Sequence, residues 1–336
     1  MTTTNSERNF RRWLLFLIGY TLIVILWGAW VRFSHSGDGC GDSWPLCQGQ
    51  LLPGSSATGK TWVELAHRAT SGLFGILVVF TFLWARKIFP ANSLARKAAK
   101  WSVIFTITEA LLGAKLVLFG LVMDNDSPFR AFAMGLHFAN SMMLTGSLIL
   151  TWDFAQNLNW RRRAISPWTN ATLNFQKIAT SCVWAFALLG CTGAIASLSS
   201  TLFPSQSLLG GLTEDFAAGS HYLIRLRGIH PILGILIGGS LALSVWISTQ
   251  LVKENETTLK SRGTRLAGLA GFEIAFGITT LFLLYPLWMK LTHLAVAHLI
   301  WIHLVLWVRE LRYLGEDSSG NLGSPSVKNH NKRTAG

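Results

Sequence analysis

Charged residues are scarce in this chain. They make up 13% of its 336 residues, whereas half of the residues are hydrophobic. The apolar residues gather in runs of about twenty or more, which a soluble domain does not need and a bilayer-spanning helix does. The scarcity of charge therefore excludes a soluble globular protein and predicts an all-α polytopic membrane protein.

Eight apolar runs are long enough to cross a bilayer as helices. The first run is too long for the apolar core of a cleaved signal peptide, and no small-residue cleavage site follows it, so we expect it to remain as a span. The predicted spans are residues 12–34, 62–86, 98–122, 129–152, 176–199, 223–250, 265–285 and 288–309.

Acidic residues are also few, 16 against 29 lysines and arginines, which gives a net charge of +13. The basic residues concentrate on the side of the predicted spans that carries the N-terminus. The positive-inside rule then places both termini in the cytoplasm of a bacterial-type inner membrane, with several passes between them. Anionic lipid headgroups account for the positive charge, so nucleic acid is not needed as a partner beside the lipid bilayer.

Only four cysteines are present. Cys40 and Cys47 lie in the first outer loop, residues 35–61, where a disulfide is permitted. Two cysteines without a paired histidine motif are an incomplete ligand set for zinc. A disulfide here would either make the loop rigid or exchange electrons, and the sequence leaves both roles open.

The second predicted span carries ionisable residues near its start. Glu64 and His67 are three residues apart and therefore share one face of a helix. A lone histidine in such a span is often structural. A glutamate and a histidine together in a membrane span are costly, and this favours a functional role in the interior of the bundle.

The chain contains an internal duplication of four helices. The third span aligns with the seventh and the fourth with the eighth, and the aligned pairs are Glu109 with Glu273, Gly113 with Gly277 and His137 with His293. The two halves would then be four-helix bundles related by a pseudo-two-fold axis along the membrane normal. We expect an N-terminal half over 1–160, a C-terminal half over 161–314 and a disordered cytoplasmic tail over 315–336.

The duplication places four histidines at one depth, one in each even-numbered span: His67, His137, His230 and His293. Each lies roughly 8–12 Å from the outer end of its helix. Two histidines in each half could supply the axial nitrogens of two haems. His221 and His298 are weaker candidates that could substitute as ligands. The outer-end cations that could contact haem propionates are Arg68, Arg130, Arg225, Arg227 and Lys290.

Residues of about 10–312 resemble the haem A synthase family. The motifs that carry the resemblance are SGDGCGDSWPLCQGQLLP in the first outer loop, ELAHRATSG, LHFAN, RGIHP and THLAVAHLIW. The resemblance implies an enzyme that oxidises the methyl at ring position eight of haem O to a formyl group, giving haem A, with a bound b-type haem as cofactor.

The resemblance also implies roles for single residues. His230 and His293 would ligate the iron of haem B, and His67 and His137 would hold the substrate haem O. Glu64 would act catalytically, near the reacting methyl. Cys40 and Cys47 would form the disulfide of the outer loop. Some family members have a second cysteine pair in the third outer loop, but the corresponding LFPSQSLLGG has none, which leaves a mechanism with two outer disulfides in doubt here.

Two other function classes fit part of the sequence. A bis-histidine cytochrome that only transfers electrons explains the four histidines but not Glu64 beside His67. A haem transporter or chaperone would be favoured by paired Gly- or Pro-interrupted helices at the membrane midplane, which the sequence lacks. Under the enzymatic interpretation the further partners are an unidentified electron donor and either a haem O synthase or a terminal oxidase.

Overall fold

A computed structural model describes residues 5–55, 57–156, 171–251 and 257–319. Within these residues the secondary structure is helical, and eight helices are long and apolar enough to cross a membrane, which confirms the predicted all-α membrane fold. The spanning helices are α1 (Asn5–Phe33), α2 (Gly59–Ile88), α3 (Leu94–Leu118), α4 (Pro128–Ala155), α5 (Ala171–Leu202), α7 to α8 (Tyr222–Leu233 and Gly239–Leu251), α9 (Thr257–Phe282) and α10 (Leu287–Ser319).

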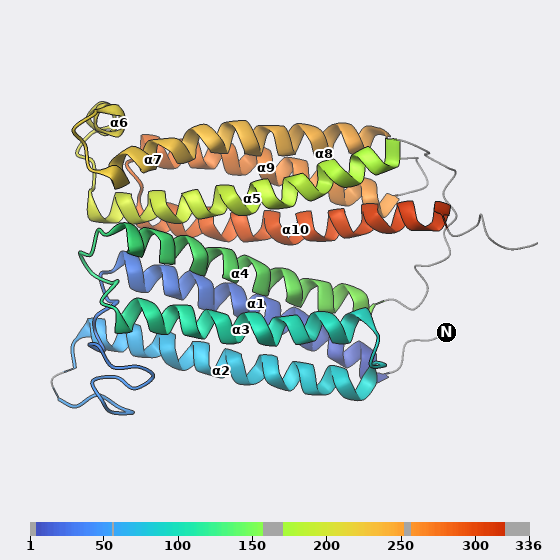
Figure 1. The fold of residues 1–336 in the computed structure, drawn as a ribbon, viewed down its shortest axis with the longest axis horizontal. Helices are drawn as coiled ribbons and strands as arrows, with labels where there is room; N and C mark the ends of the chain where they lie inside the picture. The colour runs from blue at the N-terminus through green and yellow to red at the C-terminus, as the bar shows by residue number, and fades with distance from the viewer. Residues whose placement is uncertain (1–4, 56, 157–170, 252–256, 320–336) are drawn as a thin grey trace, which may run out of the picture.

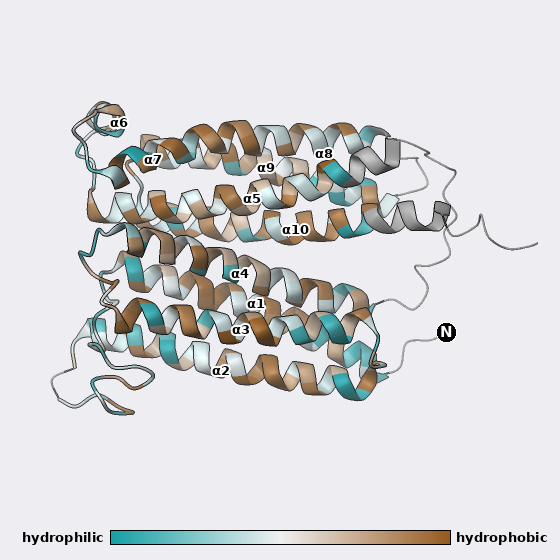
Figure 2. Ribbon diagram, in the orientation of Figure 1, coloured by the Kyte–Doolittle hydropathy of each residue, from teal (hydrophilic) through white to brown (hydrophobic). Residues whose placement is uncertain are grey.

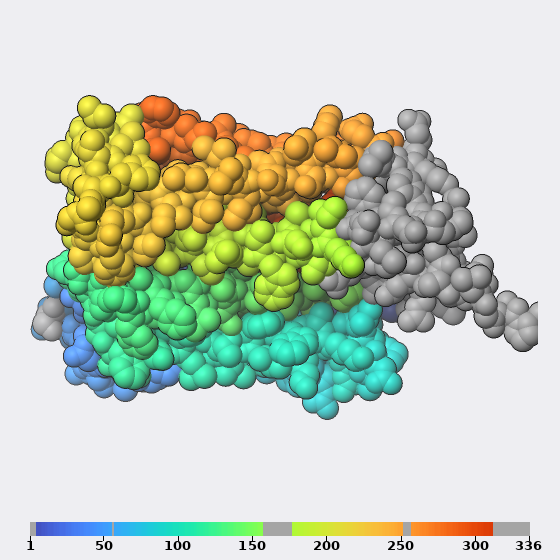
Figure 3. Space-filling model, turned by 45° about the horizontal axis from the view of Figure 1, so that its top comes forward, coloured from blue at the N-terminus to red at the C-terminus, as the bar shows by residue number. Residues whose placement is uncertain are grey.

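The spanning helices run roughly side by side in two groups of four (Figure 1). In the first group α1 packs on α2 and α4, and α3 packs on α2 and α4. In the second, α5 packs on α7 and α10, and α9 packs on α8 and α10. Each group thus closes into a four-helix bundle, and the space-filling view shows one lying on the other (Figure 3). The predicted pseudo-two-fold axis remains a prediction.

Several helices begin after a serine or threonine whose side chain accepts a hydrogen bond from a backbone N–H of the first turn. The Ser93 hydroxyl accepts a hydrogen bond from the backbone N–H of Arg96, and Ser127, followed by Pro128, accepts one from Arg130. Thr58 and Thr61 form a reciprocal capping box at the start of α2. Such caps fix where a helix starts after a loop, so the ends of α2, α3 and α4 follow from local sequence.

Two features of the second bundle were not predicted. A short helix, α6 (Leu208–Phe216), lies in the third outer loop, and the sixth span contains a π-helix, η2 (Gly234–Gly238), between α7 and α8. Pro231 precedes the π-helix and has no N–H for the helical ladder, which explains the local change in pitch. The span remains one continuous helical rod rather than a broken helix.

The last helix ends later than predicted. The sequence places the start of a disordered tail at residue 315, whereas α10 continues to Ser319. The rest of that tail, 320–336, lies outside the described residues, as do the arginines at 161–163 that contribute to the predicted orientation.

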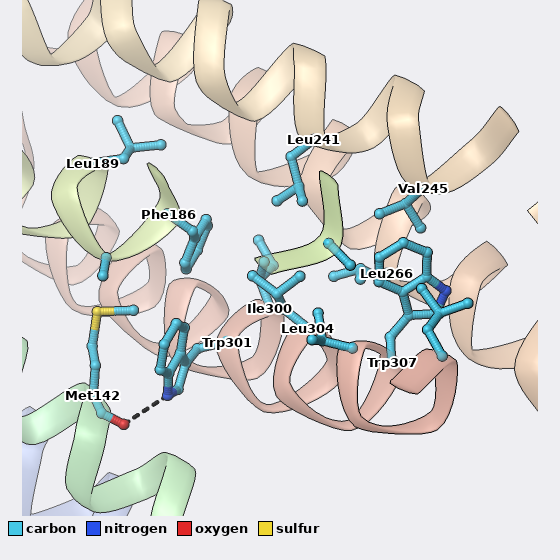
Figure 4. Close-up of a cluster of buried hydrophobic side chains, with 14 of the residues drawn as sticks. Met142, Phe186, Leu189, Leu241, Val245, Leu266, Ile300, Trp301, Leu304 and Trp307 are labelled. Carbon is cyan, nitrogen blue, oxygen red and sulfur yellow. Dashed lines mark hydrogen bonds between the residues drawn. The ribbon is translucent and has the colours of Figure 1, made fainter. Parts of the chain in front are cut away.

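A seam of tight packing joins the two bundles. Here α4 contacts α5 and α10, and α1 contacts α10. The indole Nε1 of Trp301 donates a hydrogen bond to the carbonyl oxygen of Met142 at 2.6 Å, crossing from α10 to α4 (Figure 4). Gly146 leaves room for the indole, because a Cβ there would lie 3.2 Å from Nε1. Nearer the other end of the helices, Arg309 and Asp153 form a buried ion pair across the same seam.

The hydropathy of the helices agrees with a bilayer around the bundles. Hydrophobic residues dominate the central turns, and hydrophilic ones gather at the helix ends and loops (Figure 2). The loop containing Cys40 and Cys47 lies at the same end of the molecule as α6 (Figure 1). We call this the disulfide end, and the predicted ligand histidines lie in the part of the helices nearest to it.

Candidate functional site

A cavity of about 1000 Å³ lies between the helices of both bundles. Residues from every spanning helix contribute to its wall. All four histidines predicted as ligands are among them, together with the three membrane glutamates, Glu64, Glu109 and Glu273. The fold therefore gathers into one cavity polar residues that are distant in sequence.

In the second bundle, His230 and His293 face each other from α7 and α10. Their ring centroids are 6.3 Å apart and the rings are nearly perpendicular, at 82°. Thr192 lies 3.1 Å from Nδ1 of His230, and Glu273 Oε1 lies 3.1 Å from Nδ1 of His293. Each imidazole thus has a polar group next to Nδ1, an arrangement that orients metal-ligating histidines in proteins.

In the first bundle, His137 has a corresponding glutamate. Glu109 Oε2 lies 3.7 Å from His137 Nδ1, and its carboxylate accepts hydrogen bonds from Asn140 and Ser141 on α4. His67 also lines the cavity, and its Nδ1 is buried without a hydrogen-bond partner. The two pairs, Glu109 with His137 and Glu273 with His293, occupy the positions that the sequence aligned.

Each of the four histidines packs against a glycine of a neighbouring odd-numbered helix, counting spans from the N-terminus. A Cβ built on Gly28, Gly193 or Gly277 would lie 2.9, 2.9 and 3.0 Å from Cε1 of His67, His230 and His293, respectively. These distances are shorter than normal carbon contacts, so the absence of a side chain makes room for the imidazole. The fourth contact is looser, at 3.9 Å between Gly113 and Cε1 of His137.

Glu64 joins the cavity wall to the disulfide loop. The side chain is only 3% exposed, and Oε2 accepts a hydrogen bond from the backbone N–H of Cys40 at 2.8 Å. Oε1 accepts one from Nε of Arg68 at 3.0 Å. Cys40 and Cys47 form a disulfide and are both fully buried.

The side chains predicted to contact propionates differ in how many of their hydrogen-bond donors already have a protein partner. Arg68 lines the cavity, but its guanidinium binds Glu64 and the carbonyl oxygens of Ser43 and Leu46. Arg130 lines the cavity and donates to the carbonyl oxygens of Met123 and Asn125, while its Nε is buried without a partner.

Of the three other predicted propionate contacts, Lys290 lines the cavity, whereas Arg225 and Arg227 lie away from its wall. Arg225 is exposed, and Arg227 is 1% exposed and donates from Nε to Asp215 of α6 at 2.8 Å. Burial raises the pKa of the Asp215 carboxyl, and the hydrogen bond from Arg227 opposes this shift. This buried pair attaches the outer helix α6 to α7.

The two weaker histidine candidates also lie outside the cavity wall. His221 caps α7 and lies 3.3 Å from Asp126. His298 is buried at the seam, where its Nδ1 lies 3.0 Å from the carbonyl oxygen of Leu294. Neither imidazole therefore lines the cavity, where it could replace one of the four predicted ligands.

Sequence reasoning missed two kinds of residue in the cavity wall. The first is the set of glycines that contact histidines, although the pairing of Gly113 with Gly277 in the repeat was a partial signal. The second is Arg32, at the disulfide end of α1, which lines the cavity near Lys290. Its position within GAWVRFSHS, at the end of a span, resembled that of an ordinary interfacial arginine.

Comparison with known proteins identifies a family and several relatives. Residues 11–305 match the family model COX15-CtaA, described as a cytochrome oxidase assembly protein. A protoheme IX farnesyltransferase of Thermus thermophilus is 35% identical over 293 residues, which cover 85% of this chain and 47% of that protein. The chain thus spans about half the length of this relative.

Relatives from two other bacteria carry a different name. A heme A synthase of Symbiobacterium thermophilum is 37% identical over 131 residues, covering 39% of this chain and 40% of that protein. A heme A synthase of Bacillus cereus is 35% identical over 144 residues, covering 43% of each chain.

Proposed function

The chain belongs to the COX15-CtaA family of cytochrome oxidase assembly proteins, and from this premise we propose that it is a haem A synthase. The reaction is oxidation of the methyl at ring position eight of haem O to a formyl group. The relatives named heme A synthase support this activity. A relative named for farnesylating protoheme IX supports a farnesylated haem, haem O, as the substrate.

The spacing of His230 and His293 is the observation that carries the proposal. A metal–imidazole bond is about 2 Å long and the ring centroid lies about 1 Å beyond the nitrogen, so two imidazoles that held one iron between them would have centroids about 6 Å apart. The observed separation of 6.3 Å fits this arrangement. We assign His230 and His293 to haem B.

The first bundle would hold the substrate through His67 and His137. Both line the cavity, and the partnerless Nδ1 of His67 and the close approach of Gly28 fit an imidazole held for a ligand. His137 is backed by Glu109, as His293 is by Glu273. The corresponding placement in the two bundles supports two haem sites related by the proposed pseudo-two-fold axis.

Glu64 is the proposed catalytic side chain. Side-chain acids and bases do not attack a methyl C–H bond, so the oxidising chemistry is supplied by bound haem. Glu64 lies in the cavity wall on the same helix face as His67, one helical turn away. Held in place by Arg68 and the Cys40 N–H, it can orient water or accept a proton beside the substrate methyl.

We propose that the disulfide end faces the outside of a bacterial-type inner membrane and that both termini are cytoplasmic, as the distribution of basic residues predicts. The disulfide loop would then meet an oxidising compartment. An electron donor, and a haem O synthase or terminal oxidase next to it in the reaction sequence, are the proposed partners.

Extraction of the bound pigments tests the function. The full chain, purified from a host that produces haem O, should yield haem B together with haem O or haem A, and haem A should accumulate with time under air. A chain that yields haem B alone under these conditions would be a bis-histidine cytochrome, and the proposed activity would be wrong.

A further inference from the structure

Two basic side chains from opposite bundles meet at the disulfide end of the seam. Arg32 extends from α1 of the first bundle and Lys290 from α10 of the second, and both line the cavity. They share the ring of Phe33: the guanidinium carbon of Arg32 is 4.7 Å from its centroid and Nζ of Lys290 is 4.4 Å. We call Arg32 and Lys290 the seam cations.

The hydrogen bonds of the seam cations go to neutral groups. Arg32 donates to the hydroxyl of Ser197 on α5 at 3.0 Å, and Lys290 donates to the hydroxyl of Thr201 on α5 at 3.4 Å. Nε of Arg32 is buried without a partner. Arg32 therefore retains an unused donor and both side chains retain an uncompensated charge.

Carboxylates neutralise other buried cations of this chain but not these two. Arg68 is paired with Glu64, Arg227 with Asp215, and Arg309 with Asp153. Over the part of the chain that the structure describes, no ion pair includes Arg32 or Lys290. Arg130 acts on Arg32 as a further positive charge, although Asp124 and Asp126 lie close enough to compensate Arg130 itself.

Like charges beside an apolar cavity are costly unless an anion compensates them. A carboxylate supplies such a charge together with two acceptor oxygens, one for a guanidinium and one for an ammonium group. We propose that the seam cations form a shared carboxylate site, which binds the propionate groups of the tetrapyrroles held in the two bundles. This rests on the proposed function, because it takes haem as the ligand of both bundles.

The seam position gives this site a role that a propionate contact inside one bundle would not have. Arg32 belongs to the first bundle, proposed to hold the substrate, but donates to α5 of the second bundle, proposed to hold the cofactor. Lys290 of the second bundle lies on the ring of Phe33 of the first. A carboxylate bound here from either side neutralises the same two charges. The ligands of the two bundles would thus meet at one anchoring point.

Titration with a charged and an uncharged form of one ligand tests the site. The probes are iron protoporphyrin IX and its dimethyl ester, added to the haem-free full chain in nanodiscs of zwitterionic lipid. The variants are Arg32→Gln and Lys290→Gln. Lys115→Gln is the matched control, because Lys115 also lies over aromatic rings, Phe119 and Phe129, at the disulfide end of its helix but does not line the cavity.

We expect the wild type to bind the free acid more tightly than the ester. Each seam variant should weaken binding of the acid by about tenfold, the value of one charge-assisted hydrogen bond, and leave the ester unchanged. Lys115→Gln should bind both probes as the wild type does. Equal losses for acid and ester, or no loss in either seam variant, would overturn the proposal.

Two further measurements separate this inference from its alternatives. If the wild type bound acid and ester equally tightly, and anionic lipid raised the thermal stability of the wild type but not of Lys290→Gln, the anion would be a lipid phosphate and the proposal would be wrong. If the wild type discriminated acid from ester as expected but never produced haem A, the proposed enzyme activity would fail while the carboxylate site stood.

Discussion

Glu64 accepts a hydrogen bond from the backbone N–H of Cys40 at 2.8 Å, so the glutamate one helical turn before His67 is attached to the disulfide loop. Arg68 completes the link by donating both to Glu64 and to the carbonyl oxygens of Ser43 and Leu46. These hydrogen bonds connect the proposed catalytic carboxylate to the disulfide loop, so we expect that moving the loop would also move the carboxylate.

Replacing Glu64 should therefore have two effects. Glu64→Ala should leave haem B bound but abolish conversion of haem O, because the cavity loses its carboxylate next to His67. It should also expose the buried disulfide, since a buried hydrogen bond to a charged group contributes about 1.5–3 kcal/mol. We expect reduction of Cys40–Cys47 by a thiol reagent to become at least tenfold faster, measured by alkylation and mass spectrometry.

Glu109→Ala is the matched control for this prediction, because Glu109 also lines the cavity but accepts its hydrogen bonds from Asn140 and Ser141 on α4. Its disulfide should react at the wild-type rate. If Glu64→Ala protected the disulfide as well as the wild type does, the proposed link between loop and carboxylate would be unimportant.

Which haem is lost on replacing a histidine should depend on the bundle that contains the histidine. His230→Ala and His293→Ala should each lose haem B, because one of the two imidazoles proposed to hold it, 6.3 Å apart, is missing. His67→Ala and His137→Ala should keep haem B and lose the substrate haem. Reduced-minus-oxidised spectra and haem chromatography on the purified variants measure this, and loss of haem B in all four variants would contradict the assignment.

The glycine contacts predict a graded series. Gly193→Ala and Gly277→Ala would place a methyl 2.9 and 3.0 Å from Cε1 of His230 and His293, the proposed haem B ligands, so at least one ring must shift. We expect lower haem B content and an altered low-spin electron paramagnetic resonance signal. Gly113→Ala, where the corresponding distance is 3.9 Å, should leave both measurements unchanged.

The Asp215–Arg227 pair should behave as a buried ion pair that holds α6 on α7. Arg227→Met alone leaves Asp215 as an uncompensated buried charge and should destabilise the fold by about 3–5 kcal/mol. Asp215→Leu alone should cost less, because Glu214 Oε2 lies 3.7 Å from Nη2 of Arg227 and still compensates its charge. The double variant should recover most of this loss, because no isolated charge remains buried. Thermal unfolding in detergent measures the difference, and strictly additive losses in the double variant would show that the pair is not coupled.

The membrane class, the eight spans and the position of the four histidines along their helices could be predicted from the sequence alone. Those properties depend on the length of apolar runs and on the rise per residue of a helix, both of which are local. The resemblance in the first outer loop supplied the disulfide, which the structure contains. The caps at Ser93 and Ser127 likewise act within a few residues.

The contacts between polar groups, by contrast, could not be predicted without the packing of the helices. Arg68 and Arg227 were predicted to contact a ligand carboxylate, yet Glu64 and Asp215 pair with them. Arg32 was not predicted as such a contact, and it lines the cavity at the seam. The contacts of glycines with His67, His230 and His293 were likewise not predicted from the sequence. The physical reason is that hydropathy fixes how deep a residue lies along its helix, whereas the rotation of each helix and its neighbours fix what the side chain contacts.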